Sequence, residues 1–370
     1  MRLEKLINFS TYEVDWKNVW KVKEFEKLKS CEQNPVWHRE GNAGIHTQKV
    51  VEAAQKIIKE ERYTLSDMEK ALLITSALFH DIGKGVTTEF KKGNWHAYNH
   101  EIEGERITRV LLWDWPTRLR EEICALVRWH MEPLRVFEGK ETLEKIVRLA
   151  KRSYIKVLLA LKEADLMGSD QLQDKTNDYM KLQTIRDITL NMQCYDNKSI
   201  IPLEGEYPWN LVNRKNTCIC LIGLAGAGKD TYIKTMQEEN EEWRDAVVLC
   251  RDDIRVQLGL CKEGEKIVAK AYDEDRVTKV FNELMEKSAK EGKTIIINNL
   301  NLKKKYRDDY HNRLAAYGYG FEYVYLEAKP LSKNYDRRDG QITESIFNNM
   351  IMGFDWPDYT EYDSFKIETN

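Results

Sequence analysis

The chain has 370 residues, of which 42% are hydrophobic and 32% are charged, and its formal net charge is −3. Such a length is long for a single domain, so we expect two domains, each with enough apolar side chains for a core. The composition excludes a disordered or collagen-like chain. No apolar run approaches the length of a membrane-spanning helix, and the charged first residues do not resemble a secretory signal.

Cysteine and histidine are distributed unevenly along the chain. The seven cysteines form no C-x-x-C pair and several lie in apolar runs, so we expect free thiols in a reduced, cytoplasmic protein. Six of the seven histidines fall between positions 38 and 130, whereas a glycine-rich run lies beyond position 220. Two kinds of chemistry are therefore expected in two separate parts of the chain.

Residues 17–200 have the apolar spacing of helices, with apolar side chains three and four positions apart, as in 72–79. Because β-branched runs of strand length are missing, we predict an all-α domain over residues 1–200. Residues 201–216 contain two prolines and a glycine among polar residues, which interrupt regular structure. We place a linker between the two domains there.

Residues 217–370 alternate between short apolar runs and amphipathic stretches. The runs expected to be strands are 217–224, 246–250, 294–297 and 321–326, and the expected helices include 229–239 and 273–290. This alternation predicts an α/β domain built on a parallel sheet.

The helical part holds a set of candidate metal ligands, which are His46, His80, Asp81, His100, His130 and Asp165. Imidazoles and carboxylates without a nearby cysteine favour magnesium or a first-row transition metal over structural zinc. Such an ion can activate water and polarise a phosphoryl oxygen, and six ligands are enough for two ions. The structural alternative is a histidine packed in the core or lying on the surface, as for His96 or His311.

The motifs around these residues resemble those of the HD-domain phosphohydrolases over about residues 34–170. They are WHREGN before His46, ALFHDIGK at 77–84, YNHE at 98–101, VRWH at 127–130 and EADLMG at 163–168. The resemblance implies that His46, His80, Asp81 and Asp165 bind a first metal ion, and that His100 and His130 bind a second ion or the substrate phosphate. The implied metal is a divalent transition ion such as Mn²⁺, Co²⁺ or Ni²⁺, with one or two ions bound.

Three points in this assignment stay open. His96 could replace His100, because two residues four positions apart can share one face of a helix. Asp170 is a second candidate for the closing aspartate. Lys84 and Arg128 could neutralise phosphate charge or could simply be solvated.

The glycine-rich run GLAGAGKDT at 223–231 follows an apolar strand and opens a helix, as a P-loop does. Its main-chain N–H groups would hold phosphates, and Lys229 would reach the β- and γ-phosphates. The candidate nucleotide-binding residues are Gly223, Ala225, Gly226, Ala227, Gly228, Lys229, Asp230 and Thr231. Asp230 stands where Ser or Thr normally contacts Mg²⁺, so either Thr231 takes that role or Asp230 binds the metal through water.

The sequence RDDIR at 251–255 follows the second expected strand. A carboxylate at the carboxyl end of that strand can accept a proton from an attacking hydroxyl, and an arginine three residues later can bind a phosphate. The alternative is a helix cap followed by solvated charges. In this position the motif resembles the bacteriophage-type polynucleotide 5′-kinases, which implies Asp252 as the general base and Arg255 as a phosphate ligand.

Two later motifs support the same resemblance. NLNL at 299–302 is similar to the Asp-Thr-Asn-Leu strand end of those kinases, with Asn299 in place of the aspartate. KNYDRR at 333–338 is similar to their lid, in which an arginine closes over the transferring phosphate. Arg337 fits that spacing best, with Arg338 next.

Charge gives little support for broad nucleic-acid binding. The basic run 303–305, with Arg307 and Arg313, could follow a nucleic-acid backbone, but two nearby aspartates favour a solvated face. The formal charge is about +2 for residues 1–200 and about −5 for residues 201–370. Any contact with nucleic acid must therefore come from local grooves and specific arginines.

The order of the two parts resembles the bacterial HD-Pnk end-healing enzymes, in which an HD domain precedes a P-loop kinase with a helical lid. This implies a bifunctional enzyme that phosphorylates 5′-OH ends of RNA or DNA with ATP or another NTP and Mg²⁺, with Lys229, Arg255 and Arg337 stabilising the developing charge. It also implies hydrolysis of 2′-, 3′- or 2′,3′-cyclic phosphates, a polynucleotide ligase as functional partner, and no membrane association. Two alternatives remain: a small-molecule nucleotide or nucleoside kinase-phosphohydrolase, and a non-catalytic NTP-gated binding protein.

Overall fold

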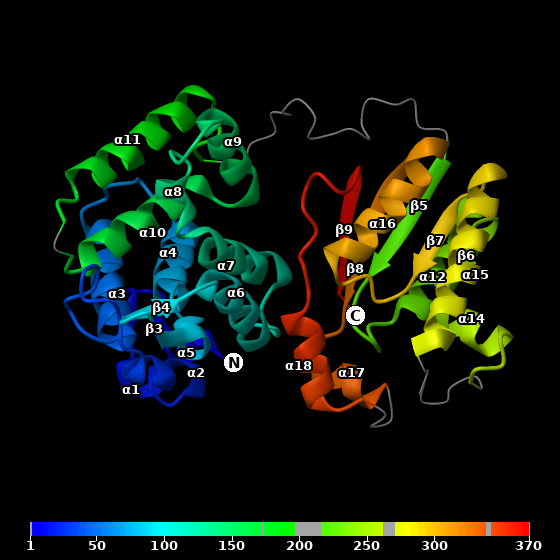
Figure 1. Cartoon of the computed structure of the whole chain (residues 1–370), viewed down its shortest axis with the longest axis horizontal. Coiled ribbons are helices and arrows are strands. Elements are labelled where there is room, and N and C mark those ends of the chain that lie inside the picture. Colours follow the sequence, from blue (N-terminus) through cyan, green and yellow to red (C-terminus); the bar gives the residue numbers. More distant parts are fainter. Residues whose placement is uncertain (1, 172, 197–215, 262–270, 338–341, 370) are drawn as a thin grey trace. The chain divides into compact units, whose positions relative to one another are not determined.

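The computed structural model describes residues 2–171, 173–196, 216–261, 271–337 and 342–369. The chain divides into two compact units, Met1–Ile201 and Pro202–Asn370, which are considered separately (Figure 1). The expected linker at 201–216 lies outside the described residues except for Asn216, which is already the first residue of a strand.

The first unit is helical, as predicted. Its longer helices are α3 (Ala43–Lys59), α4 (Asp67–Phe79), α6 (His100–Leu111), α7 (Thr117–Trp129), α9 (Thr142–Arg152), α10 (Ile155–Gly168) and α11 (Thr176–Asn191). Its short helices are α1 (Trp16–Val19), α2 (Lys23–Glu26), α5 (Lys84–Thr87), α8 (Glu132–Arg135) and the 3₁₀ turns η1 (Leu3–Lys5) and η2 (Lys27–Ser30).

Two small antiparallel strand pairs correct the all-α expectation for this unit: β1 (Ile7–Asn8) with β2 (Glu13–Val14), and β3 (Thr88–Lys91) with β4 (Asn94–Ala97). In the second pair the connecting residues Lys92 and Gly93 both have positive φ, 51° and 77°. Such a two-residue turn matches the twist of a hairpin. The hairpin has aromatic cross-strand neighbours, Phe90 and Trp95, in place of the β-branched run on which the expectation relied.

Helix α10 forms the centre of the first unit. All but two of its 14 residues are buried, including the charged Lys162 and Asp165. It packs closely on α3, since a Cβ added at Gly168 would lie 2.8 Å from the main-chain nitrogen of Val50. Two charged side chains at such a position need partners in the interior, and these partners form the candidate site described below.

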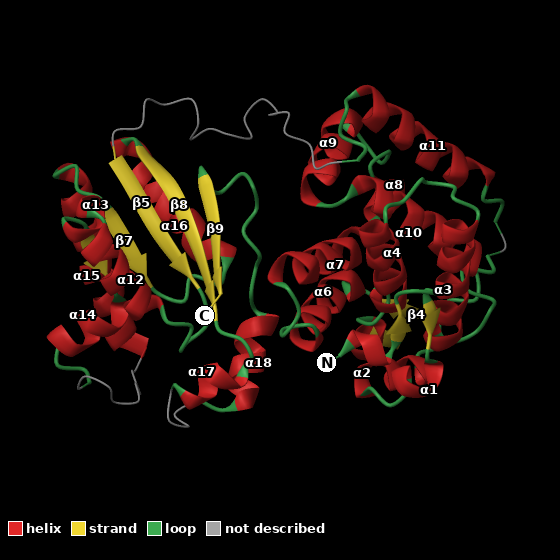
Figure 2. Ribbon diagram, turned by 180° about the vertical axis from the view of Figure 1, so that it is seen from behind, coloured by secondary structure: helices red, strands yellow, loops and turns green. Residues whose placement is uncertain are grey.

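The second unit is built on a five-stranded parallel sheet with strand order β6-β7-β5-β8-β9, as predicted for an α/β domain (Figure 2). Its strands are β5 (Asn216–Ile222), β6 (Val247–Leu249), β7 (Ile295–Asn298), β8 (Tyr319–Glu327) and β9 (Ser364–Thr369). Its helices are α12 (Lys229–Glu239), α13 (Glu241–Arg244), α14 (Arg251–Gln257), α15 (Ala271–Lys290), α16 (Lys304–Leu314), α17 (Ser332–Asp336), α18 (Glu344–Met352) and the 3₁₀ turn η3 (Ala315–Tyr317). Strand β9 was not predicted, because it lies at the sheet edge and alternates between exposed and half-buried residues.

Both faces of this sheet are covered. Ile219 and Leu221 of β5 pack with Ile233 and Trp243, which lie on α12 and α13. Helix α15 contacts β6 and β7 and also α16. The carboxyl ends of β5, β6 and β7 therefore meet at one edge of a buried sheet, which is where parallel α/β sheets bind ligands.

Arg307 on α16 is a structural residue. Its side chain is fully buried, its Nε lies 2.7 Å from Glu361 Oε2, and its Nη2 donates to the carbonyl of Asp355 at 2.9 Å. It joins α16 to the C-terminal segment and cannot follow a nucleic-acid backbone. Arg313, by contrast, forms a partly exposed ion pair with Asp309 at 2.8 Å, in line with a solvated face.

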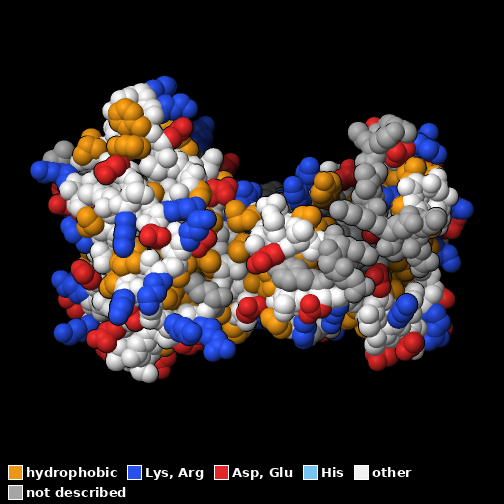
Figure 3. Space-filling view, turned by 90° about the horizontal axis from the view of Figure 1, so that it is seen from below, with side chains coloured by type: hydrophobic (Ala, Val, Ile, Leu, Met, Phe, Trp, Pro, Cys, Tyr) orange, Lys and Arg blue, Asp and Glu red, His pale blue; other side chains and the backbone are white. Residues whose placement is uncertain are grey.

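Other features agree with the composition. All seven cysteines are free thiols. His311 is a core residue: it stacks on Phe321 at 3.6 Å, lies 2.9 Å from the Tyr323 hydroxyl, and has its pKa lowered to about 4 by burial. Within the described residues no helix is long and apolar enough to cross a membrane. On the face shown in Figure 3, basic and acidic side chains are interspersed.

The Arg307–Glu361 pair makes a stability prediction. Arg307→Ala removes the buried cation of the Glu361 carboxylate and leaves only the partly exposed Lys304 ammonium, 3.5 Å away, so the free energy of unfolding should fall by about 3–5 kcal/mol in urea titrations. Arg313→Ala, on the same helix, should change it by less than about 1 kcal/mol, because that pair is partly exposed. Equal effects of the two changes would contradict the structural role of Arg307.

Candidate functional sites

The structure brings the six predicted histidines and aspartates of the first unit together in its interior. They come from α3, from the ends of α4 and α7, from the start of α6 and from α10. Each is buried, with exposed fractions between 0% and 8%; the residues are His46, His80, Asp81, His100, His130 and Asp165. We call this set the His/Asp cluster.

Main-chain carbonyls orient three of the imidazoles. The Nδ1 atoms of His80, His100 and His130 lie 2.9, 2.8 and 2.7 Å from the carbonyl oxygens of the residues three positions earlier in the chain. Because a carbonyl oxygen can only accept, each Nδ1 must carry a proton, and the one neutral tautomer compatible with this contact has its Nε2 lone pair toward the cluster. This arrangement of the second nitrogen is typical of metal-binding histidines.

Asp81 connects two groups of possible ligands, which are His46, His80 and Asp165 on one side and His100 and His130 on the other. Its Oδ2 lies 3.3 Å from His80 Nε2, and its Oδ1 lies 3.4 Å from His100 Nε2. In the first group His46 Nε2 lies 3.0 Å from Asp165 Oδ1. One carboxylate thus faces both groups, as a ligand shared by two ions would.

The donors fit a divalent cation. The Nε2 atoms of His100 and His130 lie 3.3 Å apart, and burial lowers the pKa of both rings, so two lone pairs face each other. His80 Nε2 is buried without a hydrogen-bond partner. Burial acts to raise the pKa of Asp81, but the interactions of its carboxylate with His80 and with the Lys84 ammonium outweigh burial and hold the pKa well below its usual value. Neutral imidazoles with ionised carboxylates are the ligands of transition-metal sites.

Two buried lysines accompany the aspartates. Lys84 Nζ lies 2.7 Å from Asp81 Oδ2 and donates to Gln33 Oε1, also at 2.7 Å. Lys84 is therefore not a solvated residue. Lys162 Nζ lies 2.7 Å from Asp165 Oδ2 and was missed by the sequence analysis, although a lysine three residues before an aspartate on one helix is a recognisable pair.

Glu40 was also missed. Its Oε1 lies 2.8 Å from the Nδ1 atoms of both His38 and His46, and its Oε2 accepts a hydrogen bond from the main chain of Asp170 at 2.8 Å. Glu40 can therefore fix the proton on His46 Nδ1 and leave Nε2 free for the cluster. It lies in the WHREGN motif, and a carboxylate so close in sequence to a candidate ligand histidine is the signal that could have identified it.

The open alternatives differ in position. His96 lies in β4 and stacks on Tyr98, so it shares no helix face with His100, and it is not among the grouped ligands of the described residues. Asp165 lies in the cluster, whereas Asp170 contacts Glu40 through its main chain. Arg128 lies 3.6 Å from Glu105 and over the ring of Trp129, and is partly exposed.

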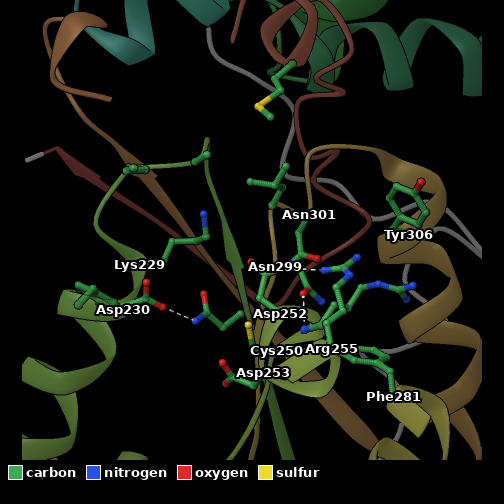
Figure 4. A pocket seen from close by; sticks show the side chains of 18 of the residues that line it. Lys229, Asp230, Cys250, Asp252, Asp253, Arg255, Phe281, Asn299, Asn301 and Tyr306 are labelled. Atoms are coloured by element: carbon green, nitrogen blue, oxygen red, sulfur yellow. Dashed lines mark hydrogen bonds and ion pairs between the residues drawn. The ribbon is translucent and has the colours of Figure 1, made fainter. Parts of the chain in front are cut away.

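In the second unit the P-loop follows β5 and opens α12, and it lines a cleft of about 2010 Å³ at the carboxyl ends of the strands (Figure 4). Gly226 and Gly228 have positive φ, 75° and 92°. A Cβ at Gly226 would lie 2.7 Å from the carbonyl oxygen of Asn334, so glycine is required there by space as well. Lys229 Nζ donates to the carbonyls of Gly223 and Leu224 at 2.9 and 3.0 Å, across the loop.

Asp230 faces the neighbouring strand. Its Oδ1 accepts a hydrogen bond from Asn298 Nδ2 at 2.7 Å, which is drawn as a dashed line in Figure 4. The carboxylate is thereby held at the end of β7 inside the cleft, and Thr231 also lines the cleft. Both residues remain candidates for the Mg²⁺ contact.

Asp252 and Arg255 enter the same cleft from α14 (Figure 4). Asp252 Oδ1 lies 2.5 Å from Arg255 Nη1, and the Asp252 side chain is 60% exposed. The other two donors of Arg255 form a bidentate pair with Glu274 of α15, with both distances 2.8 Å. The arginine is thus held by two carboxylates, while Asp252 keeps an exposed carboxylate for a substrate.

Arg255 is oriented by Glu274 of α15, whereas Asn299, which stands in place of an aspartate of the resembled kinases, contacts the main chain. The Asn299 Oδ1 accepts a hydrogen bond from the main-chain nitrogen of Arg251 at 3.1 Å and so supports the start of α14. Glu274 also lies 3.1 Å from Arg251 Nη2. Sequence reasoning missed Glu274 because it lies 19 residues beyond its partner.

The predicted lid contacts the P-loop through main-chain atoms. Asn334 Nδ2 donates to the carbonyl of Ala225 at 2.9 Å, and Arg337 Nη1 donates to the carbonyl of Gly226 at 3.1 Å. Arg337 therefore lies beside the loop, while Arg338 lies outside the described residues. Arg337, Lys229 and Arg255 are thus three of the cationic side chains that line the cleft, and the others are Lys234, Arg251, Lys305 and Arg313.

Each unit matches a known protein family. Residues 44–166 match the HD domain family, and residues 218–355 match an AAA domain family. The chain is 29% identical over 132 residues to a protein of Autographa californica nuclear polyhedrosis virus assigned as a bifunctional polynucleotide kinase/RNA ligase. It is 34% identical over 88 residues to the multifunctional CCA protein of Actinobacillus pleuropneumoniae.

These matches are partial. They cover 33% and 24% of this chain, and 18% and 20% of the viral and bacterial proteins, so the chain spans about a fifth of the length of these relatives. A crystal structure of a sugar kinase from Janibacter sp. HTCC2649 superposes with a TM-score of 0.31 and 16% identity over 42% of this chain and 85% of that one, a likeness too low to carry an argument. The two family matches show that the chain carries an HD domain followed by an AAA domain of the P-loop kinase-like type.

Proposed function

We propose that this chain heals nucleic-acid ends. Its kinase part, residues 217–370, would transfer the γ-phosphate of ATP or another NTP to a 5′-OH of RNA or DNA. Its hydrolase part, residues 1–200, would remove 2′-, 3′- or 2′,3′-cyclic phosphates from such ends. The two domains support a kinase and phosphohydrolase with nucleotide-related substrates, and the choice of polynucleotide ends is our inference.

The observation that carries the kinase assignment is the pairing of Asp252 with Arg255 inside the P-loop cleft. In the proposed reaction Asp252 accepts the proton of the 5′-OH while the oxygen of that hydroxyl bonds to the γ-phosphorus of the NTP. The bond between the γ-phosphorus and the oxygen that bridges it to the β-phosphate breaks and releases the nucleoside diphosphate. Lys229, Arg255 and Arg337 stabilise the negative charge that develops. Mg²⁺ held near Asp230 or Thr231 would neutralise the phosphates of the donor.

The hydrolase assignment rests on the His/Asp cluster. Divalent ions held there would supply activated water and polarise the phosphoryl oxygen. The residues would hold these ions through the Nε2 atoms of the four histidines and through Asp81 and Asp165, as implied for the HD domain. Lys84 and Lys162, each 2.7 Å from an aspartate oxygen, would keep the two buried aspartates ionised and fixed.

A polymeric substrate is favoured over a small molecule for two reasons. The cleft of about 2010 Å³ is larger than the roughly 300–1,000 Å³ of typical small-ligand pockets. The viral relative is also assigned as a polynucleotide kinase/RNA ligase, which is the kind of kinase proposed here. A ligase that seals the processed ends would be the functional partner.

The direct test uses labelled oligonucleotides with 5′-OH ends, or with 3′-phosphate or cyclic-phosphate ends, together with ATP and a panel of divalent metals. Asp252→Ala should lower 5′ phosphorylation by about 10²–10⁴-fold and leave phosphate removal unchanged, because it removes the general base. Asp81→Ala should abolish phosphate removal alone. Absence of any end modification with every metal would refute the proposal, and weak salt dependence with a preference for mononucleotides would favour the small-molecule alternative.

Metal content gives a test that does not depend on activity. Purified protein loaded with Mn²⁺, Co²⁺ or Ni²⁺ should retain about two ions per chain by elemental analysis. Asp81→Ala should lower the content of both ions, because this carboxylate faces both ligand groups, whereas His130→Ala should lower it by about one ion. Unchanged metal content in a folded Asp81→Ala protein would contradict the shared-ligand arrangement.

Glu274 provides a third prediction. Glu274→Gln removes the charge that holds Arg255, so kcat for 5′ phosphorylation should fall about tenfold or more, with little change in the KM for ATP. Glu274→Asp should restore part of this loss. Glu283→Gln, an exposed change on the same helix, is the matched control and should behave as wild type. A loss of thermal stability without a loss of kcat would assign Glu274 a structural role.

A further inference from the structure

The hairpin formed by β3 and β4, with Tyr98 directly after it, is attached to the His/Asp cluster. The carbonyl oxygen of Ala97, the last residue of β4, accepts the hydrogen bond from His100 Nδ1 at 2.8 Å. Asn99 then turns the chain with φ 59°, and α6 begins at His100. A molecule lying on this hairpin is therefore only a few residues along the chain from a predicted ligand of the reacting phosphate.

The hairpin exposes aromatic rings that a folded protein normally buries. Phe90 and Tyr98 are 62% and 60% exposed. Phe90 lies directly opposite Trp95 in the strand register, with 5.1 Å between ring centroids. His96 and Tyr98 are stacked, also at 5.1 Å, with their planes only 8° apart.

These rings form two pairs, in each of which one ring is exposed and the other is half-buried. A parallel pair such as His96 and Tyr98 can be continued by a further planar group that stacks on the exposed Tyr98 ring. The turn of the hairpin adds two exposed lysines, Lys91 and Lys92, of which Lys91 lies 3.6 Å from Glu89. Exposed aromatic rings beside cations are how proteins bind single-stranded nucleic acid: the bases stack and the cations meet the phosphates.

We propose that this hairpin is a stacking platform for the terminal bases of the single-stranded end whose phosphate enters the His/Asp cluster. The inference rests on the proposed function and names the part of the hydrolase that distinguishes a polynucleotide from a small phosphoester. The cross-strand pairing and the two-residue turn hold the rings in place before a substrate arrives. The lysines favour a polyanion over an apolar protein segment as the occupant.

The test compares two substrates of the full-length, metal-loaded protein. One is a single-stranded oligonucleotide with a 3′-phosphate, and the other is 4-nitrophenyl phosphate, which has no bases to stack on the hairpin. Tyr98→Ala and Phe90→Ala should each lower kcat/KM for the oligonucleotide about tenfold and leave hydrolysis of 4-nitrophenyl phosphate unchanged. Tyr98→Phe should retain oligonucleotide activity, since it keeps the ring. Tyr179→Ala, which removes a partly exposed aromatic side chain on α11, is the matched control.

The outcomes separate this inference from the proposed function. A wild-type protein that hydrolyses neither substrate would overturn the proposed function and the inference together. A wild-type protein active on the oligonucleotide, with Tyr98→Ala and Phe90→Ala equally active, would overturn the inference alone and leave a protein partner as the occupant of the hairpin. Equal losses on both substrates would also overturn it, because they would mean that the hairpin merely supports His100.

Discussion

The first unit depends on one electrostatic constraint, which is the burial of Asp81 and Asp165 among helices. An ionised carboxylate in a protein interior is strongly unfavourable unless other groups compensate its charge. Here each aspartate has a buried lysine at 2.7 Å and imidazoles on its other oxygen. The cluster and its lysines come from α3, α5, α6 and α10 and from the ends of α4 and α7, so the packing of these helices must bring those positions together.

In the second unit, too, charged side chains are held by oppositely charged or polar partners, but here the held groups are cations. Three strand ends meet at an edge where anionic substrates would bind, and the side chains there are cations restrained by carboxylates or by main-chain carbonyls. Arg255 is fixed by Asp252 and Glu274, and Arg337 by the carbonyl of Gly226. A cation that is oriented beforehand loses less side-chain entropy when a phosphate arrives. Each unit thus holds its charged groups in place before any ligand is present.

The sequence was informative where spacing and chemistry coincide. The strand–loop–helix order around Lys229 and the alternation of strands and helices predicted the parallel sheet, and the structure has it. The six members of the His/Asp cluster were chosen from motif order, and the fold gathers them in one place. Their roles as ligands stay a prediction, and so do the roles of Asp252 and Arg255.

The site residues that were not predicted owe their roles to contacts between separate elements of the fold. Glu274 lies on a separate helix from Arg255, and Glu40 lies in the loop before the helix that carries His46. Glu274 has no local pattern that distinguishes it from other glutamates, and the role of Glu40 depends on the fold, which brings its carboxylate to His38 and His46. The β3–β4 hairpin was missed for a different reason, since its aromatic pair replaces the β-branched residues by which strands are usually recognised.

The contact between the lid and the P-loop also bears on which substitutions the chain can accept. Asn334 and Arg337 donate hydrogen bonds to the carbonyl oxygens of residues 225 and 226. These hydrogen bonds therefore depend on the path of the main chain and do not involve the side chain at 225. At 226, by contrast, any Cβ collides with the segment it must touch. Two adjacent residues in one loop are therefore constrained in different ways: at 225 the lid contact requires only the main-chain path and the small side chain is limited by its burial, whereas at 226 the lid contact itself excludes any side chain.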